Sequence, residues 1–181
     1  MSYKSIVAVA SGEKDDALVL NAAAKLAVRS SGQVRVIPGY PDAAADLVYF
    51  GAVLSRAADT VMERVRDGEA VNQKQLQTAA REAAAREGVR FESCGAAPCL
   101  YVDERSLLPA IAIAEAAVLA DLVMFAARPA RDLYGLAAPF AETLLEARAP
   151  VLIVKDDQFG FGAVAIAWDG SAQAGRAVRA A

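Results

Sequence analysis

The sequence predicts an α/β fold, a three-layer open parallel sheet of five strands with helices on both faces. Two observations predict it. Short apolar runs of strand length alternate with helical patterns, as in right-handed βαβ units. The runs at 121–125 and 151–154 also lack polar alternation, which is typical of strands buried on both faces. In such sheets ligands bind at the carboxyl ends of the strands, where the strand order reverses.

The elements follow in order. A strand at 5–10 precedes a helix at 15–29, whose apolar residues recur at helical spacing. A second strand at 33–37 ends at the Pro-Gly-Tyr-Pro loop of 38–41, and the stretch 43–54 is ambiguous. A long charged helix at 56–87, with a break expected near Asp67-Gly68, ends at Gly88. The remaining elements are a strand at 89–93, a short extension at 100–102, a helix at 106–119, a strand at 121–125, a helix at 136–147 and a strand at 151–154.

The end of the chain restarts the pattern of its beginning. Residues 164–171 slide over 6–13 without a gap, so that Gly170 falls on Gly12. We therefore expect one domain over 1–158 and, over 159–181, a linker and the first strand and helix start of a second, truncated copy. So short a piece cannot form its own core. We expect its strand at 164–168 to pack against the first domain or against a partner chain, or to be poorly ordered.

Composition narrows the class of protein. Hydrophobic residues make up 56% of the chain, the net charge is −3, and no basic stripe is visible, so nucleic acid is not an expected partner. The apolar runs are too short to span a bilayer, and the amino terminus does not resemble a secretory signal, which favours a cytoplasmic protein without a membrane role.

Histidine is absent, which excludes Ser-His-Asp and Cys-His catalysis and every His-ligated metal site. Cys94 and Cys99 are the only cysteines, and a zinc site needs four ligands. We expect two reduced thiols around a loop, with a redox or metal role as the alternative.

Several motifs together resemble the universal stress protein family. They are the strand, Asp-Gly-Ser turn and Ala-rich helix pattern, the Ala-Asp-Leu-Val strand at 120–123, and the Ala-Glu-x-x-Leu helix that runs into 149–154. The second-copy start at 167–171 resembles the tandem members of that family. The likeness covers nearly all of 1–158 except 40–87. It implies a Rossmann-like, adenine nucleotide alpha hydrolase-like sheet with strand order 3-2-1-4-5, and a role as a stress-response sensor or adaptor more than as a classical enzyme.

The resemblance also implies where a nucleotide would bind. In nucleotide-binding members an Asp closes the first strand, and a loop after the fourth strand supplies glycines and a hydroxyl to the phosphates. Here Ser11 replaces the Asp, and the early glycines fall at Ala126 and Pro129. The late Gly-Ser pair falls at Pro139-Phe140 or at Ala138-Pro139. We expect this degenerate loop not to cradle a triphosphate in the usual way.

Some binding chemistry remains at the same mouth. Arg128 and Arg131 can hold a phosphate or another anion; alternatively they pair with Asp132 or with solvent, and Ser11 caps the helix. Asp169 matches the family position directly, so ATP or another adenine nucleotide is expected more in the complete second domain. The candidate binding residues are Ser11, Gly12, Ala126, Arg128, Arg131 and Asp169.

A second resemblance gives an enzyme alternative. Residues 11–16 resemble the Ser-Gly-Gly-x-Asp-Ser loop of the ATP pyrophosphatases, which would make the chain an ATP-binding or ATP-hydrolysing enzyme. Glu13 and Asp16 replace the second Gly and the last Ser, so two carboxylates would face the anion. Asp15 and Asp16 are more simply first-turn acids that the helix dipole stabilises.

The last strand of the first domain predicts a partner. Members of the universal stress protein family, which this chain resembles, pair their final strands across a twofold axis. An uncovered apolar edge strand at 151–154 favours such pairing. We expect a homodimer through this strand.

Overall fold

The computed structural model describes residues 3–39, 57–92, 96–103, 109–128 and 136–156, and also residues 171, 172, 174, 175 and 178. Within the long third helix, side chains are described from residue 70 onward. The ambiguous stretch 43–54 and the second-copy strand at 164–168 lie outside the described residues. The division into two domains therefore stays a prediction.

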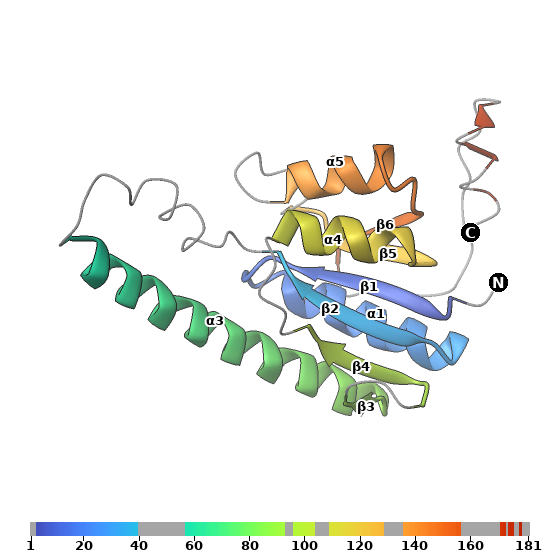
Figure 1. Cartoon of the computed structure of the whole chain (residues 1–181). Coiled ribbons are helices and arrows are strands. Elements are labelled where there is room, and N and C mark those ends of the chain that lie inside the picture. Colours follow the sequence, from blue (N-terminus) through green and yellow to red (C-terminus); the bar gives the residue numbers. More distant parts are fainter. Residues whose placement is uncertain are drawn as a thin grey trace.

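A parallel sheet forms the middle layer of the fold (Figure 1). Its order is β3-β4-β2-β1-β5-β6, and every neighbouring pair is parallel. The strands are β1 (Ser5–Ala10), β2 (Gln33–Pro38), β3 (Arg90–Phe91), β4 (Cys99–Val102), β5 (Leu122–Ala126) and β6 (Val151–Val154). This confirms the expected α/β class with a parallel sheet.

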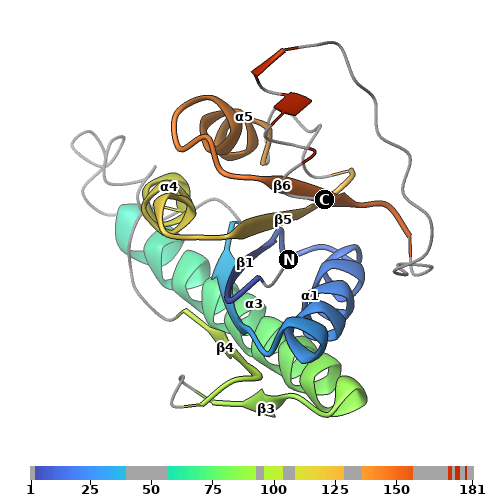
Figure 2. The same ribbon diagram turned by 90° about the vertical axis from the view of Figure 1, so that its right-hand side faces the viewer.

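Helices cover both faces of the sheet. Helices α1 (Asp16–Ser30) and α3 (Ala57–Glu87) lie on one face, and α4 (Pro109–Val118) and α5 (Ala137–Leu145) lie on the other. The end-on view in Figure 2 shows the three layers. Each face has its own apolar core, because alternate side chains of β1 point to opposite sides: Ile6 and Ala8 join the α1–α3 core, and Val7 and Val9 join the α4–α5 core.

The sheet has one strand more than expected. The run at 89–93 forms only the two-residue β3 at the edge, and the strand that pairs with β2 is β4, which was expected as a short extension. The reason is burial: Cys99 and Leu100 of β4 are fully buried on opposite faces, whereas Arg90 of β3 is exposed. A strand beside β2 must be apolar on both faces, and only β4 meets this condition.

Helix α3 runs unbroken for 31 residues, so the break expected near Asp67-Gly68 does not occur. It ends as expected at Gly88, whose φ of 68° is in the left-handed region. Its later part packs on the sheet layer through a buried stripe of Leu76, Ala80, Ala83 and Ala84. In Figure 1 its amino-terminal half reaches past the carboxyl ends of the strands.

Two further expectations can be compared with the fold. Cys99 is buried and disulfide-bonded, so the expectation of reduced thiols is wrong. The close spacing of the only two cysteines in the sequence permits the bond; Cys94 lies outside the described residues. Among the helices described, none has both the length and the apolar character needed to cross a membrane.

Candidate functional site

The strand order reverses at β1, which lies between β2 and β5. Ser11 and Gly12 follow β1 directly, while Ala126 ends β5 and Arg128 lies just beyond it. The two connections come together here, because Arg128 Nε lies 3.5 Å from Asp15 Oδ2 at the start of α1. Parallel α/β sheets bind ligands at such a mouth. Four of the six candidate residues therefore gather where the sequence placed them; Arg131 and Asp169 lie outside the described residues.

The hydrogen-bond donors at the tip of β1 are directed to a carboxylate of the protein itself. The Ser11 N–H and hydroxyl donate to Asp16 Oδ1 over 2.7 and 2.8 Å, and the Gly12 N–H donates to Asp16 Oδ2 over 2.8 Å. Gly12 has a φ of 82°, a conformation that glycine adopts readily. Asp16 is the first residue of α1, as the first-turn interpretation expected, but its side chain turns back onto the strand end.

The environment of Asp16 perturbs its titration. The residue is only 7% exposed. Burial raises the pKa of Asp16 above its usual value, since the charged form loses hydration, and the negative charge of Glu13 adds to this rise. The hydrogen bonds from Ser11 and Gly12 lower the pKa of Asp16 but do not outweigh burial.

Ser11 does not cap α1 in the expected way. The N-cap position is Asp15, whose side chain makes no capping hydrogen bond. The Ser11 hydroxyl donates to Asp16 and accepts a hydrogen bond from the Glu13 N–H over 3.3 Å. The hydroxyl thus stabilises the turn itself.

Arg128 has a different partner from those expected. It pairs with Asp15, while its side chain stays 76% exposed. An exposed pair of this kind contributes little to stability. Asp132, the partner considered from the sequence, lies outside the described residues.

Apolar packing fills the mouth next to β2. Gly39 follows β2, and a Cβ added to it would lie 2.5 Å from Leu136 Cδ2 and 2.8 Å from Val9 Cγ1. Leu136, directly before α5, is 1% exposed. Sequence reasoning did not single out Leu136, and it considered Asp16 only as a first-turn acid or as the replacement of a loop serine, not as the acceptor for Ser11 and Gly12. A Leu before a helix gives no signal of such a role, and an acid in a first helical turn signals only a dipole contact.

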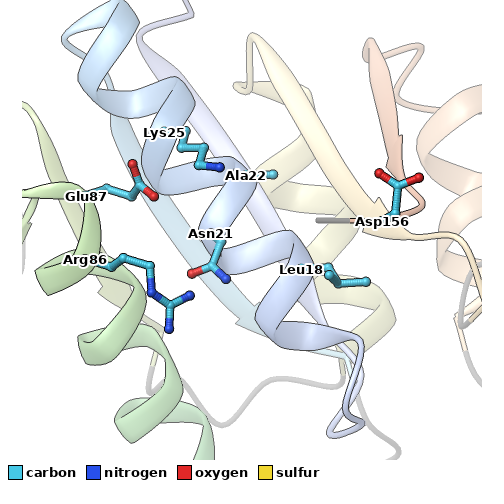
Figure 3. Close-up of a pocket in the computed structure, with 7 residues that line it drawn as sticks. All are labelled: Leu18, Asn21, Ala22, Lys25, Arg86, Glu87 and Asp156. Atoms are coloured by element: carbon cyan, nitrogen blue, oxygen red, sulfur yellow. The ribbon is translucent and has the colours of Figure 1, made fainter. Parts of the chain in front are cut away.

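A separate hollow of about 130 Å³ lies along α1 (Figure 3). Its lining mixes apolar side chains with charged groups of both signs. The lining residues come from α1, from the end of α3 and from the segment just after β6, and they are Leu18, Asn21, Ala22, Lys25, Arg86, Glu87 and Asp156. None of the four described candidate residues lines it. Among the described residues there is also no cluster of three or more Cys, Asp or Glu side chains that could hold a metal ion.

The sequence matches no protein-family model and no curated protein. Two solved structures are similar in fold. The universal stress protein from Archaeoglobus fulgidus is 20% identical with a TM-score of 0.53, and the match covers 86% of this chain and 96% of that one. A universal stress protein in complex with cAMP is 16% identical with a TM-score of 0.47, over 86% of this chain and 98% of that one. The chain therefore has the fold of the Archaeoglobus fulgidus universal stress protein.

Proposed function

We propose that the chain is a universal stress-type protein that acts as a stress-response sensor or adaptor in the cytoplasm and not as a classical enzyme. Its fold and its sequence motifs support the family. The observation that carries the proposed mode of action is the contact of Asp16 with Ser11 and Gly12. The backbone donors that an anionic ligand would need at the tip of β1 are already engaged.

The connection after β5 supports the same proposal. Ala126 occupies the first glycine position of the family loop, and it is 2% exposed and packed in the α1–α3 core, so this position lacks the backbone freedom that a glycine gives such a loop. Arg128, the described cation of this connection, is drawn to Asp15. An incoming phosphate would have to compete with one carboxylate for the donors and with a second carboxylate for the cation.

The enzyme alternative finds less support in the same turn. An ATP pyrophosphatase-type loop presents its glycine N–H and serine hydroxyl to pyrophosphate, but here Asp16 stands in the place of that serine and accepts from the turn. A second anion beside it would be repelled. Absence of AMP and pyrophosphate formation from ATP by the purified chain would agree with the adaptor role; their formation at a rate that depends on Ser11 would support the enzyme.

Isothermal titration with ATP tests the degenerate loop. We expect no binding by the chain, and we expect binding to appear when Ala126→Gly, Pro129→Gly and Ala138→Gly are combined. Three Ala→Gly changes on exposed helix positions, at Ala70, Ala85 and Ala141, give a control for the added backbone freedom. Tight ATP binding by the unchanged chain would contradict the proposal.

The proposed partner is a second copy of the chain, bound through β6. In the described sheet β6 pairs with β5 alone, and its Ile153 side chain is 43% exposed. Helix α5, which precedes β6, also exposes Leu145 at 73%. An edge with apolar side chains and unpaired backbone groups favours strand pairing. The mass in solution at micromolar concentration, measured by light scattering, should be that of a dimer; a monomer would contradict this part of the proposal.

A further inference from the structure

Asp16 is a buried carboxyl group beside a turn, residues 11–15, whose own residues are partly or fully exposed. The residue is 7% exposed, and its three hydrogen bonds come from uncharged donors, the N–H groups of Ser11 and Gly12 and the Ser11 hydroxyl. Within the described part of the chain no Lys or Arg pairs with it. Among the described residues only dipoles compensate the charge of the ionised carboxyl group, and a net cost of desolvation remains.

The charged groups around this carboxyl group do not relieve that cost. From the turn, Glu13 contributes a second negative charge. From α1, Asp15 lies next to it in sequence, and from the connection after β5 Arg128 is paired with Asp15. Arg128 is therefore partly neutralised by a neighbour of Asp16, and Lys14 of the turn is exposed to solvent.

We propose that Asp16 is an acid-tightened latch on the β1–α1 turn: the closed turn, with the carboxyl group held by Ser11 and Gly12, is favoured when Asp16 is protonated and loosened when it is ionised. Protonation removes the buried charge and keeps the contacts. A protonated carboxyl group still accepts from both N–H groups, and it can donate its proton to the Ser11 hydroxyl oxygen, whose own hydrogen is free to rotate.

The titration of Asp16 fixes the direction of the effect. Burial raises the pKa of Asp16 in the closed turn more than the hydrogen bonds lower it, while in an open, hydrated turn the pKa returns to its ordinary value. The closed turn thus binds the proton more tightly. Its advantage is complete below the ordinary pKa and is lost as the pH rises through the raised pKa. Were the hydrogen bonds dominant, the sign would be reversed, so the sign itself is a test.

The latch acts at the mouth of the sheet. When the turn opens, the N–H groups of Ser11 and Gly12 lose their internal acceptor and face the solvent at the carboxyl end of β1. Acidification would close this mouth and a return to neutral pH would loosen it. The inference concerns the conformation of the turn and stands whether or not the mouth takes a nucleotide.

Hydrogen exchange followed by NMR tests the latch in the whole 181-residue chain. The protection of the Ser11 and Gly12 amides, corrected for intrinsic exchange rates, should fall as the pH rises through the titration of Asp16, which carboxyl carbon shifts report directly. The fall should be about tenfold for each pH unit that separates the raised pKa from the ordinary one. Protection that rises with pH, or that does not follow Asp16, would overturn the proposal.

Three variants make the test specific. Asp16→Asn removes the titrating group and should abolish the pH dependence at both amides. Asp15→Asn, the matched change one residue away, should leave it in place. Ser11→Ala removes a hydrogen bond that lowers the pKa of Asp16, so the midpoint should move to higher pH; this variant keeps the proposal falsifiable if Asp16→Asn does not fold. An unmoved or lowered midpoint would contradict the claim that the Ser11 hydroxyl holds the Asp16 carboxyl group in the closed turn.

Discussion

The turn after β1 and the edge strand β6 differ in how their backbone hydrogen-bonding groups are satisfied. At the turn, the donors of Ser11 and Gly12 are met by Asp16 inside the same chain. At β6 only one side of the strand is paired in the described sheet, and Ile153 is 43% exposed. The comparison teaches that the donors at the tip of β1 already have an acceptor within the chain, whereas in the described sheet one side of β6 has no partner strand.

The largest effect is expected at the edge. Ile153→Glu places a charge on the surface that β6 is proposed to bury, so the dimer should dissociate about a hundredfold more readily. Val71→Glu is the matched control, since Val71 is 54% exposed on α3. Sedimentation equilibrium gives both constants. An unchanged dimer with Ile153→Glu would move the interface away from β6.

The next effect is expected at the turn. Asp16→Ala removes the shared acceptor of three donors, and we expect a loss of about 2 kcal/mol in the free energy of unfolding, because part-buried donors are left without a partner. Asp15→Ala should cost less than about 1 kcal/mol, since it removes only a dipole contact and an exposed ion pair. Urea unfolding compares the two. Equal losses would show that the bonds to Asp16 have no special role.

A smaller effect tests the apolar side of the mouth. Gly39→Ala should cost about 1–2 kcal/mol, because the new methyl group meets Leu136 and Val9 at distances below van der Waals contact. Leu136→Ala makes room for it, so the double variant should lose less stability than the sum of the single changes. A double-mutant cycle measures this difference, and strict additivity would mean that Leu136 does not fill the mouth.

The smallest effect is expected at Arg128. Because its side chain is 76% exposed, Arg128→Ala should change the free energy of unfolding by less than about 0.5 kcal/mol. A loss above about 1 kcal/mol would give the Arg128–Asp15 pair a structural role that its exposure does not suggest.

Much of the fold was predictable because it depends on local patterns. The unbroken apolar run at β5 and the helical spacing in α1 reflect burial directly. The expectation that 151–154 is buried on both faces is wrong, because β6 lies at the edge of the described sheet and Ile153 is 43% exposed. The choice between β3 and β4 as the neighbour of β2 was not predictable, since it depends on which of two short runs finds a partner in three dimensions. The break expected at Gly68 does not occur, because one glycine costs only about 1 kcal/mol in a helix.

The sequence predicted where the candidate residues lie, but not the contact that Asp16 makes with Ser11 and Gly12. Strand ends place Ser11, Gly12, Ala126 and Arg128 at one mouth, and this follows from the topology alone. The Asp16 side chain returns to the strand end beside the left-handed Gly12 and is buried although Gly12 itself is exposed, which no spacing of residues encodes. The packing of Leu136 on Gly39 joins two elements far apart in the sequence.

The most direct test of the central claim is mass spectrometry of the small molecules that the purified chain releases on denaturation, with a sample incubated with ATP and desalted beside it. If Asp16 holds the donors of the β1 tip, neither sample should release an adenine nucleotide in stoichiometric amount. Release of such a nucleotide by the unchanged chain, lost on Ser11→Ala or Arg128→Ala, would contradict the account and show that the mouth binds a ligand in spite of Asp16.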